Sequence, residues 1–201
     1  NGYAQSFVNV VRGTGGNDVT RNLIVNTYAA ANGYGTWNTH LKDVLTRMKM
    51  PEDKVSGHIA FEVHDYPNLT NNGTARTLAD IKSQVDGTIR ILKDNLITKG
   101  GPVIIGEWGT SNVDAGVGKT DYDVRRPLML QFVDYYVKQC KANGIAPFYW
   151  MGLSDGQYRA MPVFHQPDLA ETMVKAYHGN TFEGEFPVVE TKSEYVVFEG
   201  E

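Results

Sequence analysis

The chain has 201 residues, of which 41% are hydrophobic and 21% are charged, so it is long enough for one full hydrophobic core and has an ordinary globular composition. Its formal net charge of −4 offers no basic surface for a phosphate backbone, which argues against nucleic acid as a partner. The longest apolar runs cover a handful of residues, so the sequence predicts no membrane span and no secretory leader.

The first half of the chain predicts three helices and two buried strands. Apolar residues at helical spacing over residues 1–12 predict a helix that ends at a run of glycines. The segments 22–26 and 58–64 are apolar through their centres and are typical of buried strands. Between them a helix is predicted over residues 37–48, and a longer helix is predicted over residues 77–99.

The second half predicts two more strands, 102–107 and 146–150, each followed by a helix. Asp123 with Pro127 predicts the start of the first of these helices, because proline suits the first turn. This helix carries the single cysteine, Cys140, on its apolar face. A buried, inert thiol is therefore predicted there, and an internal disulfide or a cysteine-rich metal site is excluded.

Four successive strand–helix units with apolar strands predict a parallel sheet that is buried on both faces. No glycine-rich phosphate loop follows any of the strands, which argues against a dinucleotide-binding fold. The predicted fold class is therefore α/β, with residues 1–179 supplying four of the eight units of a barrel. Residues 180–201 are predicted to be a separate extended tail, with short β segments at 186–189 and 195–198.

The sequence places polar and aromatic groups where its strands end. These groups are Asn26, His64 with Tyr66, Glu107 with Trp108, and Trp150. In a barrel of parallel strands the carboxyl ends meet at one rim, where the active sites of this fold lie. Because every second side chain of a strand faces the same way, Glu62, His64 and Tyr66 are predicted to share the barrel interior. The same reasoning predicts that Val103, Ile105 and Glu107 share it.

Each of these residues taken alone also has a structural interpretation. Glu107 can be a carboxylate held at the edge of the core by a cation, and His64 can be a hydrogen-bonded core histidine. Tyr66 can cap a strand, and Trp150 can fill the core. Their convergence at one rim favours a binding or catalytic site.

Three motifs resemble glycoside hydrolase family 5, which contains retaining endo-β-glucanases and mannanases. The motifs are Ile104-Ile105-Gly106-Glu107-Trp108-Gly109, His64-Asp65-Tyr66 and Phe148-Tyr149-Trp150. The resemblance covers residues 1–179 in order and spacing. It implies the second half of a TIM (β/α)8 barrel, strands 5 to 8. It also implies a retaining endo-β-1,4-glycanase of the cellulase type that uses no metal and no cofactor.

The resemblance also implies roles for individual residues. Glu107 matches the nucleophile at the end of the seventh strand, and His64 and Tyr66 match the pair that orients it and contacts the sugar. Trp150 matches an aromatic platform under the same sugar. Further expected sugar contacts are Trp108, Asn26, Asp155 and Gln157, because planar amides, carboxylates and aromatic faces suit a pyranose ring.

The family's acid/base glutamate lies in an Asn-Glu-Pro motif, and no glutamate of this sequence has that context. Retaining hydrolysis needs two carboxyl groups about 5 to 5.5 Å apart, so this chain supplies one of the two. Glu62 lies two residues before His64, roughly 6 to 7 Å deeper in the barrel, and is interpreted as a buried structural group. We therefore expect a complementary N-terminal half with the acid/base residue, and we expect this chain alone to be inactive.

The expected binding partner is a β-1,4-linked polysaccharide or oligosaccharide, and the resemblance implies a secreted or extracytoplasmic protein. Two alternatives remain open, namely a non-catalytic carbohydrate-binding barrel and a hydrolase specific for mannan or xyloglucan. An aldolase-type barrel is disfavoured because it needs a Schiff-base lysine at a strand end, and no predicted strand ends in lysine.

Overall fold

The computed structural model describes residues 1–34, 44–67, 69–71, 74–109, 119–150, 164 and 166–188. The chain forms two compact units, Asn1–Trp150 and Met151–Glu201, and each is described by itself below. The predicted boundary after residue 179 stays a prediction. Within the described ranges, no helix combines the length and apolar character that a membrane crossing requires.

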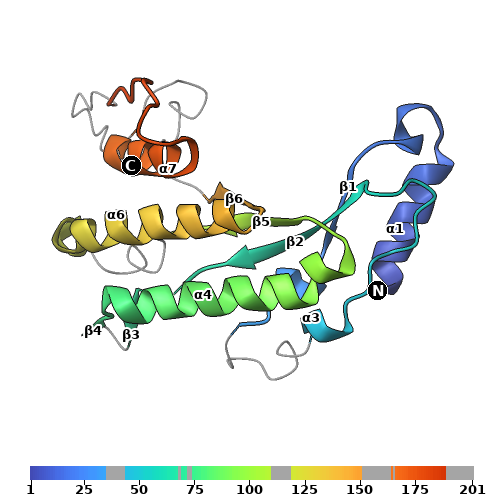
Figure 1. The fold of residues 1–201 in the computed structure, drawn as a ribbon, viewed down its shortest axis with the longest axis horizontal. Helices are drawn as coiled ribbons and strands as arrows, with labels where there is room; N and C mark the ends of the chain where they lie inside the picture. Colours follow the sequence, from blue (N-terminus) through green and yellow to red (C-terminus); the bar gives the residue numbers. More distant parts are fainter. Residues whose placement is uncertain are drawn as a thin grey trace, which may run out of the picture. The chain divides into compact units, whose positions relative to one another are not determined.

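A four-stranded parallel sheet forms the centre of the first unit (Figure 1). Its strands are β1 (Leu23–Asn26), β2 (Ile59–Asp65), β5 (Val103–Trp108) and β6 (Ile145–Tyr149), which lie in that order. Every neighbouring pair is parallel. The four predicted strands and their parallel order are therefore confirmed, with ends that differ from the prediction by at most one residue.

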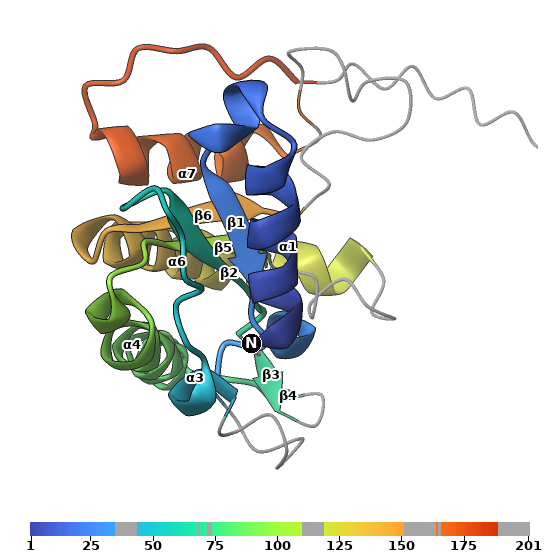
Figure 2. The same cartoon turned by 90° about the vertical axis from the view of Figure 1, so that its right-hand side faces the viewer.

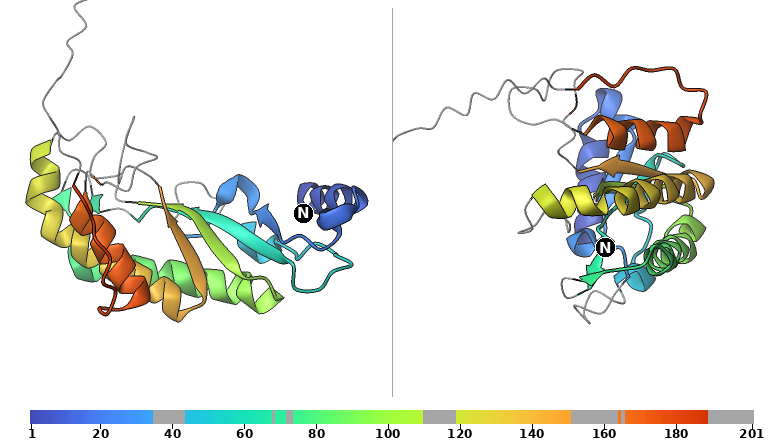
Figure 3. Two further views of the ribbon diagram at one scale, coloured as in Figure 1. Left: turned by 90° about the horizontal axis from the view of Figure 1, so that it is seen from above. Right: turned by 90° about the vertical axis from the view of Figure 1, so that its left-hand side faces the viewer.

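Helices α4 (Leu78–Asn95) and α6 (Lys119–Ala142) lie side by side on one face of the sheet (Figure 3). Helix α4 buries one stripe of side chains, which includes Ile81, Val85, Ile89 and Leu92. Its first turn is capped by Thr77, whose hydroxyl accepts a hydrogen bond of 3.1 Å from the backbone N–H of Asp80. A cap of this kind stabilises a helix by about 1 kcal/mol.

The start of α6 differs from the prediction. The helix begins at Lys119, so Pro127 lies inside it and not in its first turn. Proline lacks an N–H, and the hydrogen bond to the carbonyl of Asp123 is therefore lost while the backbone stays helical on both sides. Cys140 is buried on this helix as predicted, and burial raises the pKa of its thiol.

The remaining elements of the first unit are short apart from one helix. They are α1 (Gly2–Gly13), α3 (Val44–Arg47), the 3₁₀ turns Gly16–Val19, Tyr28–Ala30 and Ile97–Lys99, and the antiparallel pair β3 (Thr70–Asn71) and β4 (Thr74–Ala75). Helix α3 is the described part of the helix predicted over residues 37–48.

The second unit contains α7 (Pro167–His178), close to the predicted last helix. Of the predicted β segment at 186–189, Val188 forms an isolated parallel bridge with Phe164. The segment predicted at 195–198 lies outside the described residues.

The two faces of the sheet differ in exposure. One, called here the helix-covered face, contains Phe61 and Val63, which are fully buried. The other, called here the inner face, exposes Ile24 to 49% and Phe148 to 56%. Among the described residues of the first unit no helix covers the inner face (Figure 3). In a complete barrel this face is the interior, where side chains of all eight strands pack together.

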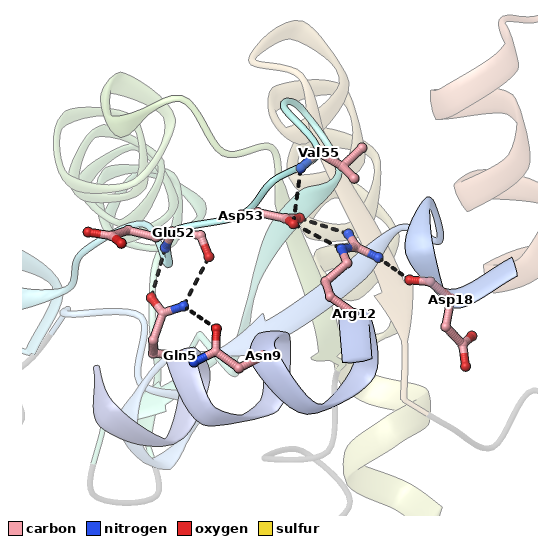
Figure 4. A network of polar contacts seen from close by, with 7 residues as sticks. All are labelled: Gln5, Asn9, Arg12, Asp18, Glu52, Asp53 and Val55. Atoms are coloured by element: carbon pink, nitrogen blue, oxygen red, sulfur yellow. Dashed lines mark hydrogen bonds and ion pairs between the residues drawn. The ribbon is translucent and has the colours of Figure 1, made fainter. Parts of the chain in front are cut away.

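Helix α1 lies beside β1, and its side chains form hydrogen bonds and an ion pair with the segment that leads into β2 (Figures 2 and 4). Arg12 donates from Nε and Nη2 to the two carboxylate oxygens of Asp53, at 2.9 and 2.7 Å. This contact lowers the pKa of Asp53. Gln5 exchanges two hydrogen bonds with the backbone of Glu52. This network lies before the amino end of β2. The amino ends of barrel strands contribute to stability, whereas the catalytic residues lie at the carboxyl ends.

Candidate active site

Strand β5 contains one extra residue near its end. Ile105 is paired with Val63, and the next residue of β2, His64, is paired with Glu107, so Gly106 has no partner on β2. An insertion of one residue into one strand is a β-bulge, and bulges next to active sites redirect the side chains that follow them. Glu107 is thereby directed to the inner face, where His64 also lies.

The bulge overturns one expectation about the strand. Val103 and Ile105 are buried on the helix-covered face, with exposures of 1% and 0%. They do not share the barrel interior with Glu107. Simple alternation along the strand fails here because Gly106 shifts the phase of β5 by one residue.

The two glycines that flank the Glu107–Trp108 pair allow β5 to approach its neighbours closely. A methyl group at Gly106 would overlap the carboxylate of Glu62 on β2. A methyl group at Gly109 would overlap the backbone carbonyl oxygen of Trp150. Only glycine lacks the atom that would clash, which is the physical reason for this part of the motif.

Two groups converge on one oxygen of Glu107. The hydroxyl of Tyr66 donates a hydrogen bond of 3.0 Å to Oε2, and Nδ1 of His64 lies 3.2 Å from the same oxygen. Burial, and then the hydrogen bond to Glu107, raise the pKa of the Tyr66 phenol, which therefore stays a proton donor at neutral pH. Neither Tyr66 nor His64 contacts the other carboxylate oxygen, Oε1, through these atoms. The Glu107 side chain is 26% exposed.

Glu62 lies on the opposite side of the His64 ring. Its Oε1 is 3.0 Å from Nε2 of His64, and its Oε2 accepts a hydrogen bond from the side-chain amide of Asn26. Burial raises the pKa of Glu62, while the neighbouring His64 and the backbone N–H of Gly106 act against that shift. Glu62 is buried, with 8% exposure, as the sequence predicts, and it is also part of the candidate site.

The residues predicted to contact sugar have different surroundings. Trp150 is 50% exposed and comes directly after β6, two residues after Phe148, so strand alternation predicts that it lies on the inner face. Asn26, at the end of β1, is exposed, and its amide nitrogen is engaged by Glu62. Asp155 and Gln157 lie outside the described residues.

The structure places Trp108 in the core and not at the rim, which corrects the expectation that it contacts sugar. Its exposure is 1%, and its ring stacks on Tyr136 of α6 with 4.4 Å between the ring centroids. Its ring also packs nearly perpendicular to that of Tyr149, with 5.2 Å between the ring centroids. The bulge explains this position, because the shift that directs Glu107 to the inner face returns Trp108 to the helix-covered face.

Asp65, between His64 and Tyr66 in the motif, is buried on the helix-covered face, and the sequence predicts no separate role for it. Its carboxylate accepts hydrogen bonds from the Tyr136 hydroxyl at 2.8 Å and from the Asn32 amide at 2.6 Å. Burial, opposed by these two hydrogen bonds, raises the pKa of Asp65 to about 6. The sequence indicates the face on which Asp65 lies, because successive side chains of a strand alternate and Asp65 directly follows His64.

The family described as Cellulase (glycosyl hydrolase family 5) matches residues 1–155 of the chain. The chain belongs to glycosyl hydrolase family 5. Among the family 5 relatives is a xyloglucan-specific endo-β-1,4-glucanase of Bacteroides ovatus, which is 32% identical over 75% of this chain and 31% of its own length. Endoglucanase B of Neocallimastix patriciarum is 27% identical over 86% of this chain and 33% of its own length.

Solved family 5 structures agree with the fold. A broad-specificity endoglucanase from an uncultured bacterium is 59% identical, with a TM-score of 0.77, over 89% of this chain and 46% of that protein. A family 5 enzyme of Prevotella bryantii in complex with a xyloglucan tetradecasaccharide is 33% identical, with a TM-score of 0.71, over 88% of this chain and 49% of that protein.

The chain spans about a third of the length of the curated family 5 relatives it matches, and about half of the similar structures. Family 5 domains are TIM barrels. The four parallel strands of this chain are therefore half of such a barrel, and the predicted family and fold class are confirmed.

Proposed function

We propose that this chain is the nucleophile-bearing second half of a retaining endo-β-1,4-glucanase, which hydrolyses β-glucan by double displacement. The observation that carries the proposal is the convergence of Tyr66 and His64 on one oxygen of Glu107. This places a carboxylate with two neighbouring donors and one remaining oxygen at the carboxyl end of a barrel strand, where this fold carries its chemistry.

In the first step, Oε1 of Glu107 attacks the anomeric carbon of the sugar and forms an ester bond to it. The glycosidic bond breaks, and the leaving oxygen takes a proton from the acid/base carboxyl group, which we assign to the complementary half of the barrel. Tyr66 and His64 hold Oε2, so that the attacking oxygen keeps its direction.

In the second step, a water molecule attacks the anomeric carbon and the acid/base carboxylate accepts the proton of that water. The ester bond breaks and Glu107 returns to its carboxylate form. Two inversions give net retention of configuration. The half-exposed indole of Trp150 offers a flat apolar face for the C–H face of the sugar.

The substrate class proposed is a β-1,4-linked glucan backbone. It is supported by the endoglucanase names of the relatives and by the xyloglucan bound to the Prevotella bryantii enzyme. Xyloglucan, which has such a backbone, is one alternative, and mannan, which is built of mannose and lies outside this class, is the other. Because such polymers lie outside the cell, we also propose that the whole protein acts outside the cytoplasm.

The experiment that tests the function is covalent trapping in the full-length polypeptide that contains this chain. A 2-deoxy-2-fluoro glycoside slows breakdown of the glycosyl-enzyme, so mass spectrometry of a digest should find the sugar on Glu107. An adduct on another residue, or products of inverted configuration, would refute the proposal. A non-catalytic carbohydrate-binding barrel would give sugar binding with neither adduct nor hydrolysis.

We further propose that a complementary N-terminal half of the barrel covers the inner face. The described part of this face exposes Ile24, Phe148 and Trp150, and helix α1 exposes Tyr3 to 95% and Val10 to 64%. Within the described sheet, β1 and β6 are the edge strands, so each leaves one row of backbone groups for a further strand. Apolar surface and open edges together favour association with more barrel strands.

The prediction is that co-expression with the first half of the 59% identical endoglucanase barrel gives a soluble 1:1 complex. Size-exclusion chromatography with light scattering measures its mass. Phe148→Glu should abolish the complex by placing a charge on the inner face, while Lys138→Glu, on an exposed turn of α6, should not. A monodisperse 22.3 kDa monomer in the presence of that half would contradict the proposal.

A further inference from the structure

Both nitrogens of the His64 ring face carboxyl groups. Nδ1 lies 3.2 Å from Oε2 of Glu107, and Nε2 lies 3.0 Å from Oε1 of Glu62. A neutral imidazole has one N–H and one lone pair, so it can donate to only one of the two carboxylates. Both short contacts can be hydrogen bonds only if the site holds one more proton. When Nδ1–H of His64 points at Glu107, this second proton lies between Nε2 of His64 and Oε1 of Glu62.

We propose that Glu62 is a positioning residue of the glycosidase site, which holds His64 so that its Nδ1–H points at the nucleophile Glu107. This inference rests on the proposed function and adds a residue to it. Glu62 does not take part in bond making. The imidazole stands between Glu62 and Glu107, so Glu62 acts on the nucleophile through His64 and is not placed to serve as the second carboxyl group at the sugar.

The site is built to hold Glu62 in this position. Asn26 on β1 donates its side-chain amide to Oε2, and the backbone N–H of Gly106 on β5 also faces the carboxylate. The register places these groups side by side, because Asn26 pairs with Glu62 along the β1–β2 ladder. A carboxyl group that contacts both neighbouring strands, β1 and β5, and is 8% exposed has little freedom to turn away from His64.

The charges around Glu62 agree with a shared proton. The titratable groups that act on it are His64 on its own strand and Glu107 on β5, and burial raises the pKa of Glu62. Three groups that hold two exchangeable protons between them carry a net charge of −1. With one proton the charge would be −2, and two carboxylates would face one neutral ring in a largely buried site.

The test compares Glu62→Gln with Glu62→Ala in the full-length polypeptide. A glutamine amide can donate to Nε2 of His64 without any titration, so Glu62→Gln should keep kcat within about fivefold. Alanine leaves the ring unsupported, and because a displacement of about 1 Å at a reacting group can cost about 10²-fold, kcat should fall by about 10- to 100-fold with KM nearly unchanged. Val85→Ala, a core change in α4, controls for lost stability and should leave kcat unchanged at a temperature where it is folded.

A second readout does not need activity. In protein with ¹⁵N-labelled imidazole, the wild type and Glu62→Gln should show His64 with a proton fixed on Nδ1, and Glu62→Ala should show averaged tautomers.

The two readouts separate this inference from the proposed function. Equal losses of kcat in both Glu62 variants, or unchanged His64 signals in Glu62→Ala, would overturn the positioning role. Altered His64 signals in a protein that forms no adduct on Glu107 would uphold the positioning of His64 while refuting the glycosidase assignment.

Discussion

Glu107→Gln in the full-length polypeptide should reduce hydrolysis of a soluble β-1,4-glucan by at least about 10³-fold, because it removes the attacking oxygen anion. The amide keeps the shape of the side chain and can still accept the hydrogen bond from Tyr66. Oligosaccharide affinity should therefore change by less than about tenfold. Reducing-sugar assays measure the first quantity and isothermal titration calorimetry the second.

The matched control for this change is Glu171→Gln on α7. Glu171 is a half-exposed glutamate that forms an ion pair with Lys175 on the same helix, so its amide variant should hydrolyse like the wild type. Thermal unfolding of both variants shows whether the fold is intact. If Glu107→Gln kept more than about a tenth of the wild-type activity, Glu107 could not be the nucleophile.

Gly106→Ala should lower kcat/KM by about 100-fold or more, although it adds a single methyl group at a residue that carries no catalytic group. The new carbon would overlap the Glu62 carboxylate and force it to move. Because His64 contacts Glu62 and also the proposed nucleophile Glu107, a displaced Glu62 should displace both of these side chains. A displacement of about 1 Å at reacting groups can cost a factor of about 10² in rate. Steady-state kinetics on a soluble β-glucan measure the effect.

Two further variants decide whether the clash with Glu62 is the cause. Gly13→Ala is the matched control, since a methyl group at Gly13 meets no atom within 4 Å, and its activity should equal that of the wild type. The double variant Gly106→Ala/Glu62→Ala removes the overlapping carboxylate. It should be no slower than Glu62→Ala alone, whereas additive losses would show that Gly106→Ala acts in another way.

Much of the site could be predicted because its parts lie at strand ends. Strands β1, β2, β5 and β6 were found from short apolar runs, since a parallel sheet buries both faces of each strand. Glu107, His64, Tyr66 and Trp150 follow directly at or near the ends of these runs, and the fold brings such ends together. The resemblance to family 5 then supplied the role of each residue.

The family, the half-barrel topology and the position of the central carboxylate Glu107 can all be predicted from the sequence, because they depend on local hydrophobic pattern and on short motifs. The one-residue shift in the pairing of β5 cannot be predicted in this way. A bulge exists only as a mismatch between paired strands, so the inward turn of Glu107 and the burial of Trp108 follow from pairing with β2 and β6. The hydrogen bonds from Asn32 and Tyr136 to Asp65 join residues that are distant in the sequence. The contact between Glu62 and His64 depends on side-chain rotamers, which no local sequence pattern specifies.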